Sequence, residues 1–247
     1  MNYPLRNARI AGALYLVIAA AAIVAHVYVP SSLVVPGDAA ATATNIAANG
    51  TLFRTAIAGE FVVLLSEIVL SVLLYVLLKP VNRTVSLLAM VSRLVMTTIH
   101  GLNLLNSYIV LMLVAGTGPA SAFEPNQTNA LVSLFLEAHD YGFTIGILFL
   151  TIHVFALGYL IVRSGFFPRA LGYLFLVAGL GYLVDSTGLL LVPGYETTPV
   201  YLMLPITISE IAFPLWLVIR GLNLKRWNER LERSTRHTEA PTTQPAA

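Results

Sequence analysis

Polar side chains that interrupt long apolar runs are the residues of this sequence with the clearest capacity for chemistry. A charged side chain at the centre of a membrane costs roughly 2.5–3.5 kcal/mol on insertion scales, so each such position carries information. Counted at about 1.5 Å per helical residue from the basic end of each run, four of them lie about 15–18 Å deep. These four residues, here called the central layer, are Glu67, Arg93, His153 and Glu210.

The central layer predicts an ion pair, because a lone arginine inside a membrane span has to be neutralised. Arg93 with Glu67 or Glu210 supplies that neutralisation. The favoured interpretation is a structural pair that fixes the register of the helices, and the alternative is a relay for protons or ions. Pro205 and Pro214 bracket Glu210 and predict a bend beside its carboxylate, because Pro214 cannot donate to the carbonyl of Glu210.

A second set of polar residues, here called the outer layer, lies about 25 Å or more from the basic ends. Imidazole and carboxylate side chains together suit zinc or a similar divalent ion, with one position open for water. The spacing is weak support, because His139 points about 100° away from Asp140 on a helix. The alternative is that these residues cap helix ends and bond the loop backbone. The outer layer consists of Glu60, His100, Asn103, His139, Asp140 and Asp185.

No cofactor is predicted from these residues, and two alternatives stay open. A single b-type haem held by His100 and either His139 or His153 is the weaker one. The other is a divalent metal with Glu60 as general base, and its candidate ligands are His100, His139, Asp140 and Asp185. Thiolate metal sites, iron–sulfur clusters and covalent c-type haem are excluded, because the sequence contains no cysteine.

Six long apolar runs must position these residues. With 57% hydrophobic and 11% charged residues, the composition differs from that of soluble domains, in which roughly 25% of residues are charged. Each run reaches the roughly 20 residues that a helix needs to cross a bilayer, which predicts an all-α integral membrane protein, a bundle of six transmembrane helices. The first run is longer than the apolar part of a cleaved signal, so we expect it to remain as a span. The runs are Ile10–Val29, Phe53–Leu78, Thr84–Ala115, Ala130–Val162, the stretch between Pro168 and Pro193, and Val200–Ile219.

Basic residues alternate along the chain and predict its orientation. Of the fourteen Lys and Arg residues, only Arg54 and Arg93 fall outside the pattern. Basic residues near span ends accumulate on the cytoplasmic side, so both termini are predicted to be cytoplasmic. The net charge of +2 follows from these residues and indicates no nucleic-acid partner. The others are Arg6, Arg9, Lys79, Arg83, Arg163, Arg169, Arg220, Lys225, Arg226, Arg230, Arg233 and Arg236.

The loops and the tail contain further signals. Pro36-Gly37-Asp38 predicts a short capped helix in the loop after the first run, and Glu124-Pro125 predicts the start of another. We expect residues 1–223 to form the transmembrane domain and residues 224–247 a basic cytoplasmic tail. The tail begins as a basic surface helix with Trp227 as an interfacial anchor and becomes disordered from about Ser234.

Several segments resemble an uncharacterised bacterial family of multi-pass membrane proteins, known as domain of unknown function 4386. They include Val35-Pro36-Gly37-Asp38, Leu78-Lys79-Pro80-Val81-Asn82, His139-Asp140-Tyr141-Gly142-Phe143 and Gly181-Tyr182-Leu183-Val184-Asp185. The resemblance implies a multi-spanning protein of the bacterial cytoplasmic membrane and supplies no activity, substrate or cofactor. The polar positions that recur in the family match Glu60, Arg93, His139, Asp140, Asp185 and Glu210.

Three classes of function stay open. The favoured one is a non-enzymatic protein that binds or transports a small or amphiphilic ligand through a polar cavity facing the outside. The alternatives are an intramembrane metal-dependent hydrolase and a structural or accessory subunit of a membrane complex. The lipid bilayer is the predicted partner in each case, and the sequence gives no oligomeric state.

Overall fold

The computed structural model describes residues 3–195 and 198–239, and this part of the chain is built from helices without a strand. Six helical segments in it are long and apolar enough to cross a membrane. The predicted all-α bundle of six spans is confirmed. The segments are Tyr3–Leu33, α4 (Gly50–Leu78), α5 (Arg83–Ala115), α6 (Pro125–Ser164), α7 (Arg169–Leu191) and α8 (Val200–Ile219).

The first span is not one regular helix. It consists of α1 (Tyr3–Ala22), a π-helical segment η1 (Ile23–Tyr28) and α2 (Val29–Leu33). At the end of η1 the amide of Val29 donates to the carbonyl of Val24, five residues earlier, which is the π-helical spacing. Such wide turns are rare and occur often at functional sites. This one carries His26, which faces the interior cavity described below.

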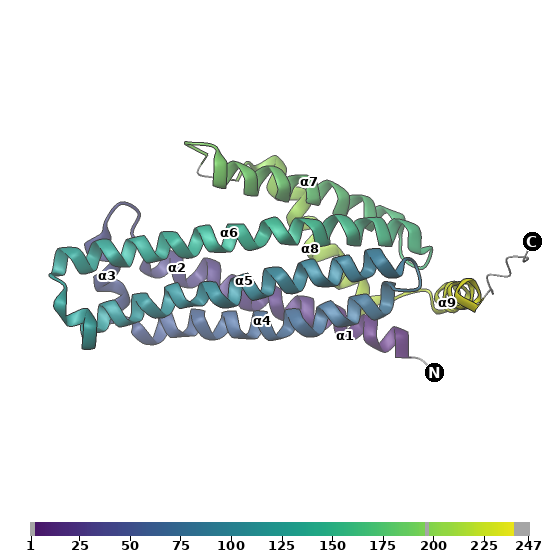
Figure 1. Cartoon of the computed structure of the whole chain (residues 1–247), viewed down its shortest axis with the longest axis horizontal. Coiled ribbons are helices and arrows are strands. Elements are labelled where there is room, and N and C mark those ends of the chain that lie inside the picture. The colour runs from purple at the N-terminus through teal and green to yellow at the C-terminus, as the bar shows by residue number, and fades with distance from the viewer. Residues whose placement is uncertain (1–2, 196–197, 240–247) are drawn as a thin grey trace, which may run out of the picture.

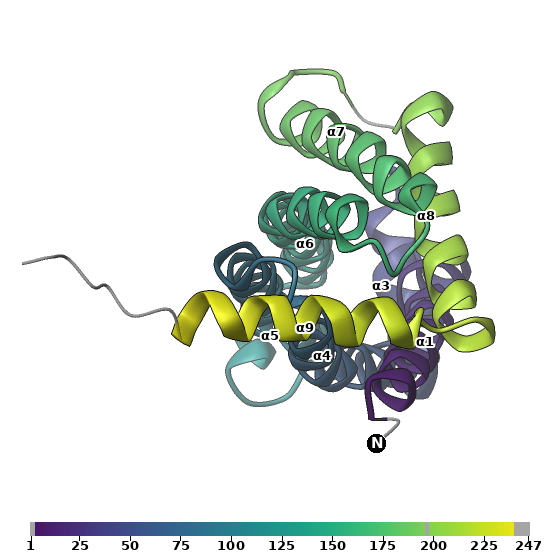
Figure 2. The ribbon, with the colours of Figure 1, turned by 90° about the vertical axis from the view of Figure 1, so that its right-hand side faces the viewer.

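The six spans form a closed ring. Each span packs against the next one along the chain, and α8 returns to pack against α1 (Figure 2). Glycines allow the closest approaches: a Cβ at Gly12 of α1 would lie 2.9 Å from the carbonyl of Pro214 in α8. A Cβ at Gly158 of α6 would lie 2.9 Å from the carbonyl of Gly172 in α7. Small residues that let backbones approach are a common basis of helix packing in membranes.

Capping residues define the helices at the end of the ring away from the chain's beginning, here called the α3 end (Figure 1). α3 (Ala39–Ala48) starts at Asp38, whose side chain accepts a hydrogen bond from the amide of Ala41. α6 starts after Glu124, which forms a capping box with Gln127. Both predicted helix starts are confirmed. A short 3₁₀ segment, η2 (Gly118–Ala122), connects α5 to α6.

α9 (Leu224–Glu239) lies across the opposite end of the ring, here called the α9 end (Figures 1 and 2). Trp227 is 1% exposed, and its indole nitrogen donates to the carbonyl of Leu77 at 2.9 Å. The expectation of an interfacial anchor is therefore wrong, because this ring packs inside the protein against α4. The prediction of disorder from about Ser234 is also wrong for the residues up to Glu239, because α9 extends to that residue. The remainder of that expectation lies outside the described residues.

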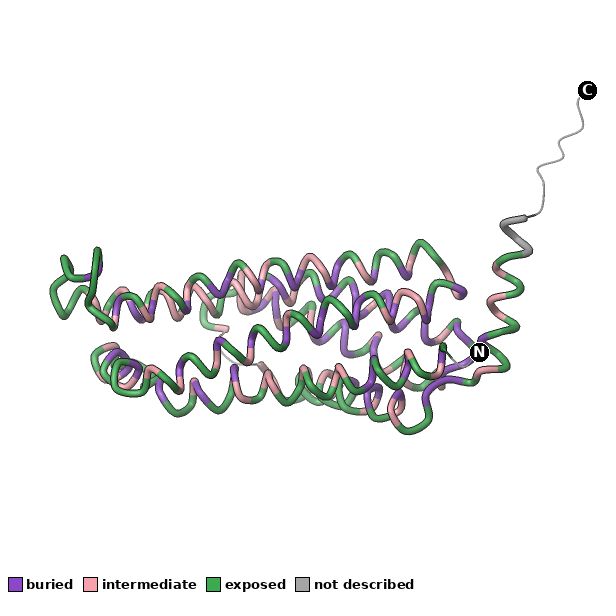
Figure 3. Tube along the Cα trace, turned by 90° about the horizontal axis from the view of Figure 1, so that it is seen from below, coloured by how far each residue is buried: buried purple, intermediate pink, exposed green. Residues whose placement is uncertain are grey.

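Packing differs between the two ends of the ring. At the α9 end, Leu77, Phe167, Phe213, Leu217 and Trp227 belong to one buried apolar cluster. Buried and exposed residues alternate along the spans, as expected when each helix has one face inward and one face outward (Figure 3). A different buried cluster, which includes Ile46 and Val110, fills the α3 end, and the cavity described below extends between the spans.

Candidate functional site: a cavity inside the helix ring

A cavity of about 430 Å³ occupies the interior of the ring. All six spans contribute to its lining, which reaches from Pro214 in the C-terminal half of α8 to Thr198 just before α8 begins. Most of the lining is aliphatic or aromatic. The polar residues of the central layer and several of the outer layer lie in this one lining, so the two layers predicted from depth border a single cavity.

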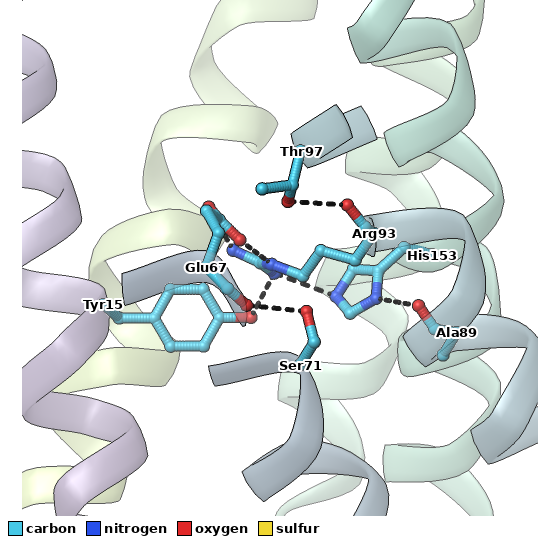
Figure 4. Close-up of polar contacts among 7 residues, drawn as sticks. All are labelled: Tyr15, Glu67, Ser71, Ala89, Arg93, Thr97 and His153. Carbon is cyan, nitrogen blue, oxygen red and sulfur yellow. Dashed lines mark hydrogen bonds and ion pairs between the residues drawn. The ribbon is translucent and has the colours of Figure 1, made fainter. Parts of the chain in front are cut away.

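Arg93 of α5 is the centre of the polar network in the middle of the ring (Figure 4). Its Nε and Nη2 atoms donate to the two carboxylate oxygens of Glu67 on α4, the Nη2 bond measuring 2.8 Å. Its Nη1 atom donates to the hydroxyl of Tyr15 on α1 at 3.0 Å, and the guanidinium lies 4.9 Å from the centre of the Tyr15 ring. One buried arginine thereby joins three helices.

The protonation state of His153 follows from its partners. Nε2 lies 3.0 Å from Nη1 of Arg93, and Nδ1 lies 2.8 Å from the carbonyl of Ala89. A guanidinium has only donors, so Nε2 must accept and Nδ1 must carry the proton that it donates to Ala89. His153 is therefore a neutral, fixed member of the Arg93 network. Both of its ring nitrogens are engaged, so a haem ligand at this position would have to give up one of these bonds.

Glu210 is not the partner of Arg93 in the central ion pair, although its depth along α8 made it a candidate. Its carboxyl group accepts a hydrogen bond from the hydroxyl of Tyr182 on α7, and both residues line the cavity. The side chain of Arg93 has Glu67 as its carboxylate partner. The physical reason is the place of α8 in the ring, between α7 and α1 and across from α5.

The residues of the outer layer do not contact one another at one site but have separate partners. Glu60 of α4 pairs with His26 of the π-helical segment at 2.8 Å, and both line the cavity. His26 was missed in the analysis of the sequence. It stands seventeen positions after Arg9, as His100 stands seventeen after Arg83, so the same count of depth would have placed it in the outer layer.

His100 and Asn103 of α5 hold the α6 backbone. His100 lies 3.0 Å from the carbonyl of Phe143 and stacks on its ring at 4.7 Å, while the amide of Asn103 donates to the carbonyl of His139 at 2.8 Å. Glycine is required opposite each of them. A Cβ at Gly146 would overlap the His100 imidazole, and one at Gly142 would overlap the Asn103 amide. These two polar residues thus serve helix packing.

Asp185 of α7 lies at the end of the cavity nearest the loop between α7 and α8. Its two carboxylate oxygens accept hydrogen bonds from Tyr195 at 2.8 Å and Thr198 at 3.0 Å. Partial burial and the adjacent Asp185 carboxylate raise the pKa of Tyr195 to about 12. Tyr195 therefore remains a hydrogen-bond donor to Asp185 at any physiological pH.

His139 and Asp140 lie apart from the rest of the outer layer. They line a second cavity of about 190 Å³, which Glu60 also borders. The Asp140 side chain is 88% exposed, and its Oδ1 atom lies 3.9 Å from Nδ1 of His139. α6 has 40 residues and is about 60 Å long, about twice the hydrocarbon thickness, so this part of it extends beyond the lipid.

The convergence on one point that a metal site in the outer layer would require is not found among the described residues. Within residues 3–195 and 198–239, no three His, Asp or Glu side chains are grouped so that they could hold a metal ion. His100, His139, Asp140 and Asp185 each have a different set of neighbours, as described above. The ligand set of the hydrolase alternative is therefore not assembled in this structure.

Comparison with known proteins agrees with this architecture. A family model described as "Domain of unknown function (DUF4386)" matches residues 10–221, which include most of the first span and all of the other five. The chain belongs to this family. The match ends where α8 gives way to α9, so the DUF4386 region coincides with the helix ring.

A relative of this DUF4386 member is described as an uncharacterized protein of Archaeoglobus fulgidus. The two are 29% identical over 168 residues, which cover 68% of this chain and 85% of the relative. No solved structure matches the chain. The family and the six apolar helices together identify a multi-pass membrane protein and assign no activity to it.

Proposed function

We propose that this protein binds, and in a transport-like manner admits, a small amphiphilic molecule in the cavity of the helix ring. The single observation that carries the proposal is a cavity of about 430 Å³ lined by all six spans. Pockets of about 300–1,000 Å³ with mostly apolar walls and a few polar groups are typical of small-molecule sites. An amphiphilic molecule matches both parts of this lining.

The reach of the cavity lining supports access from one side. Towards α9 the interior is filled by the apolar cluster that includes Leu217 and Trp227, whereas Thr198 brings the lining to the loop at the other end. We propose that the α9 end is cytoplasmic, as the alternation of basic residues predicts. The cavity then receives its ligand from the outside of the cytoplasmic membrane.

Orientation can be tested directly, because the sequence has no cysteine of its own. Ser121→Cys places a thiol at the exposed α3 end, and Thr84→Cys places one at the exposed α9 end. In intact bacterial cells a membrane-impermeant maleimide should label Ser121→Cys and should reach Thr84→Cys only after permeabilisation. The reverse pattern would overturn the proposed orientation.

Ligand binding can be tested with purified protein in lipid nanodiscs. The probes are 2-phenylethylamine, 2-phenylethanol and phenylacetate, and the measurement is the melting temperature with and without each probe. Ala22→Phe adds a ring to the cavity wall, and Ala58→Phe is a control on an exposed position of α4. At least one probe should stabilise the wild type and the control but not Ala22→Phe. No shift with any probe, or an equal shift in Ala22→Phe, would refute the proposal for ligands of this size.

A further inference from the structure

Not every acidic side chain in the cavity wall has a basic side chain as its partner. Among the residues that the structure describes, four carboxyl groups line it, and one guanidinium, that of Arg93, lies with them. Arg93 compensates Glu67, and His26 is in position to compensate Glu60. Two carboxyl groups then remain without a basic side chain beside them in the described part of the chain. They are Glu210 on α8 and Asp185 on α7.

The described cavity lining offers no free guanidinium to an anion, and its His26 pairs with Glu60. Arg93 is the arginine of the described lining, and Nε, Nη1 and Nη2 are all bonded, to Glu67, Tyr15 and His153. His153 is neutral and bonded on both ring nitrogens. An anionic ligand that binds Arg93 would therefore have to displace the Arg93–Glu67 pair, which would leave a buried carboxylate without its counter-ion.

The two unmatched carboxyl groups belong to the same wall of the ring. Tyr182 and Asp185 stand three residues apart on α7, on one face of that helix, and Tyr182 donates to Glu210 on the neighbouring α8. In the described residues the hydroxyl of Tyr182 is bonded to Oε1 of Glu210, and Oε2 has no bond of its own. The carboxyl of Glu210, which lines the cavity, thus retains one oxygen as a free acceptor.

The remaining lining suits the body of an organic cation. The rings of Tyr15, Phe143, Phe175 and Tyr182 border the cavity, between aliphatic side chains from all six spans. The faces of aromatic rings attract cations, and this attraction is stronger where water is excluded. Carboxylate and aromatic groups around an apolar space are complementary to a molecule that has one positive head and a small apolar body.

We infer that the ligand of this cavity is an organic cation, of the class of a protonated amine with a small apolar or aromatic body, whose head contacts Glu210. The inference rests on the proposed binding function and specifies its ligand class. The geometric basis is the free acceptor of Glu210, the bonded state of Arg93 and the aromatic lining. Asp185 adds a second negative charge near the outer end of the same wall, on the path of a cation that comes from the loop between α7 and α8.

The decisive experiment compares the three probes quantitatively. 2-Phenylethylamine, 2-phenylethanol and phenylacetate have nearly the same size and differ in charge, and their dissociation constants are measured by calorimetry in nanodiscs at pH 7, with empty nanodiscs as blank. The amine should bind at least about tenfold more tightly than the alcohol, as expected for a charge paired away from bulk water, and phenylacetate should bind most weakly. Equal binding of all three would overturn the cation inference and leave the binding function standing. Absence of all binding would overturn both.

A matched pair of variants locates the cation. Glu210→Gln removes one charge and keeps the shape, and Glu137→Gln is the control, at an exposed position of α6 outside the cavity lining. Glu210→Gln should reduce the preference for amine over alcohol to less than about threefold while binding of the alcohol persists, which also shows that the variant is folded. A preserved preference in Glu210→Gln would refute the role of Glu210. If this variant does not accumulate, the charge series on the wild type still decides the ligand class.

Discussion

Replacement of Arg93 by methionine tests whether the central ion pair holds the ring together. The variant removes both bonds to Glu67 and leaves the hydroxyl of Tyr15 and Nε2 of His153 without their donor. Breaking a buried pair by removing one partner typically costs about 3–5 kcal/mol, because the other charge stays buried and uncompensated. We expect a loss in this range.

The magnitude can be separated from a simple packing effect by a double-mutant cycle. Arg93→Met combined with Glu67→Met replaces the pair by apolar side chains, a change that is often neutral in other proteins. The double variant should therefore lose less stability than Arg93→Met alone, so that the coupling between the two positions is about 3 kcal/mol or more. Arg54→Met, at an exposed position of α4, is the control for the loss of an arginine in general.

The assay is reversible unfolding in mixed micelles with increasing detergent denaturant, followed by helical circular dichroism, with the melting temperature as a second measurement. On the scale of domains of about this length, a loss of 3–5 kcal/mol corresponds to roughly 6–20 °C. The structural role of the pair is refuted if Arg93→Met unfolds with the free energy and melting temperature of the wild type. It is also refuted if the double variant is as unstable as the two single variants added together.

Three further predictions concern other parts of the ring. Trp227→Ala should cost about 3–5 kcal/mol, because a large buried ring is removed, and should make α9 sensitive to trypsin; limited proteolysis that leaves α9 intact would contradict its attachment through this ring. Gly146→Ala should destabilise by about 1–3 kcal/mol through overlap with His100, and His100→Ala should relieve that loss; additive effects of the two in thermal unfolding would argue against the contact. The pKa of Tyr195 is raised to about 12 by partial burial and Asp185, so the folded state binds the phenolic proton more tightly than the unfolded state does. The resulting stability is complete below about pH 10 and is lost as the pH rises through about 12, and Tyr195→Phe should lack this loss when melting temperatures are compared across that range.

The spans and several helix ends could be predicted from the sequence because the membrane constrains both strongly. A span needs about 20 apolar residues, and backbone groups in lipid have to be bonded within the helix, so length and composition identify the spans. Asp38 and Glu124 mark helix starts because their side chains accept bonds from amides that the helix leaves free. These signals are local and need no knowledge of the fold.

The partner of Arg93 could not be chosen from the sequence. A count along each helix gives depth, and Glu67 and Glu210 have similar depths, but it does not give the order of helices around the ring. That order places α4 beside α5 and α8 across the cavity from it. The contact between His26 and Glu60 could not be predicted from the sequence either. It depends on how the π-helical segment directs the His26 side chain towards α4.

The position of α9 could not be predicted from its own sequence, because the groups that it contacts are distant from it along the chain. An amphipathic helix with a basic face can lie on a membrane or on the protein itself, and its pattern is the same in both cases. Here the ends of two spans decide, because they present carbonyl groups that α9 can bind. Trp227 donates to Leu77 in the last turn of α4, and Arg226 donates to Gly165, which follows α6.

The bonds around the cavity divide the ring into a fixed part and a freer part. α5 is joined by side-chain bonds to α4 through Glu67, and to α6 through His100, Asn103 and the ring of His153. α8 packs against α7 and α1, contains two prolines that remove helix hydrogen bonds, and carries one described side-chain bond to another span, from Tyr182 to Glu210. A cation that engages the free oxygen of Glu210 would add a contact to α8 inside the ring, and so ligand binding and the mobility of α8 are coupled. This hypothesis requires the amides of α8 to exchange with deuterium faster than those of α5, and the amine probe to slow exchange in α8 in the wild type but not in Glu210→Gln; uniform exchange in both helices would contradict it.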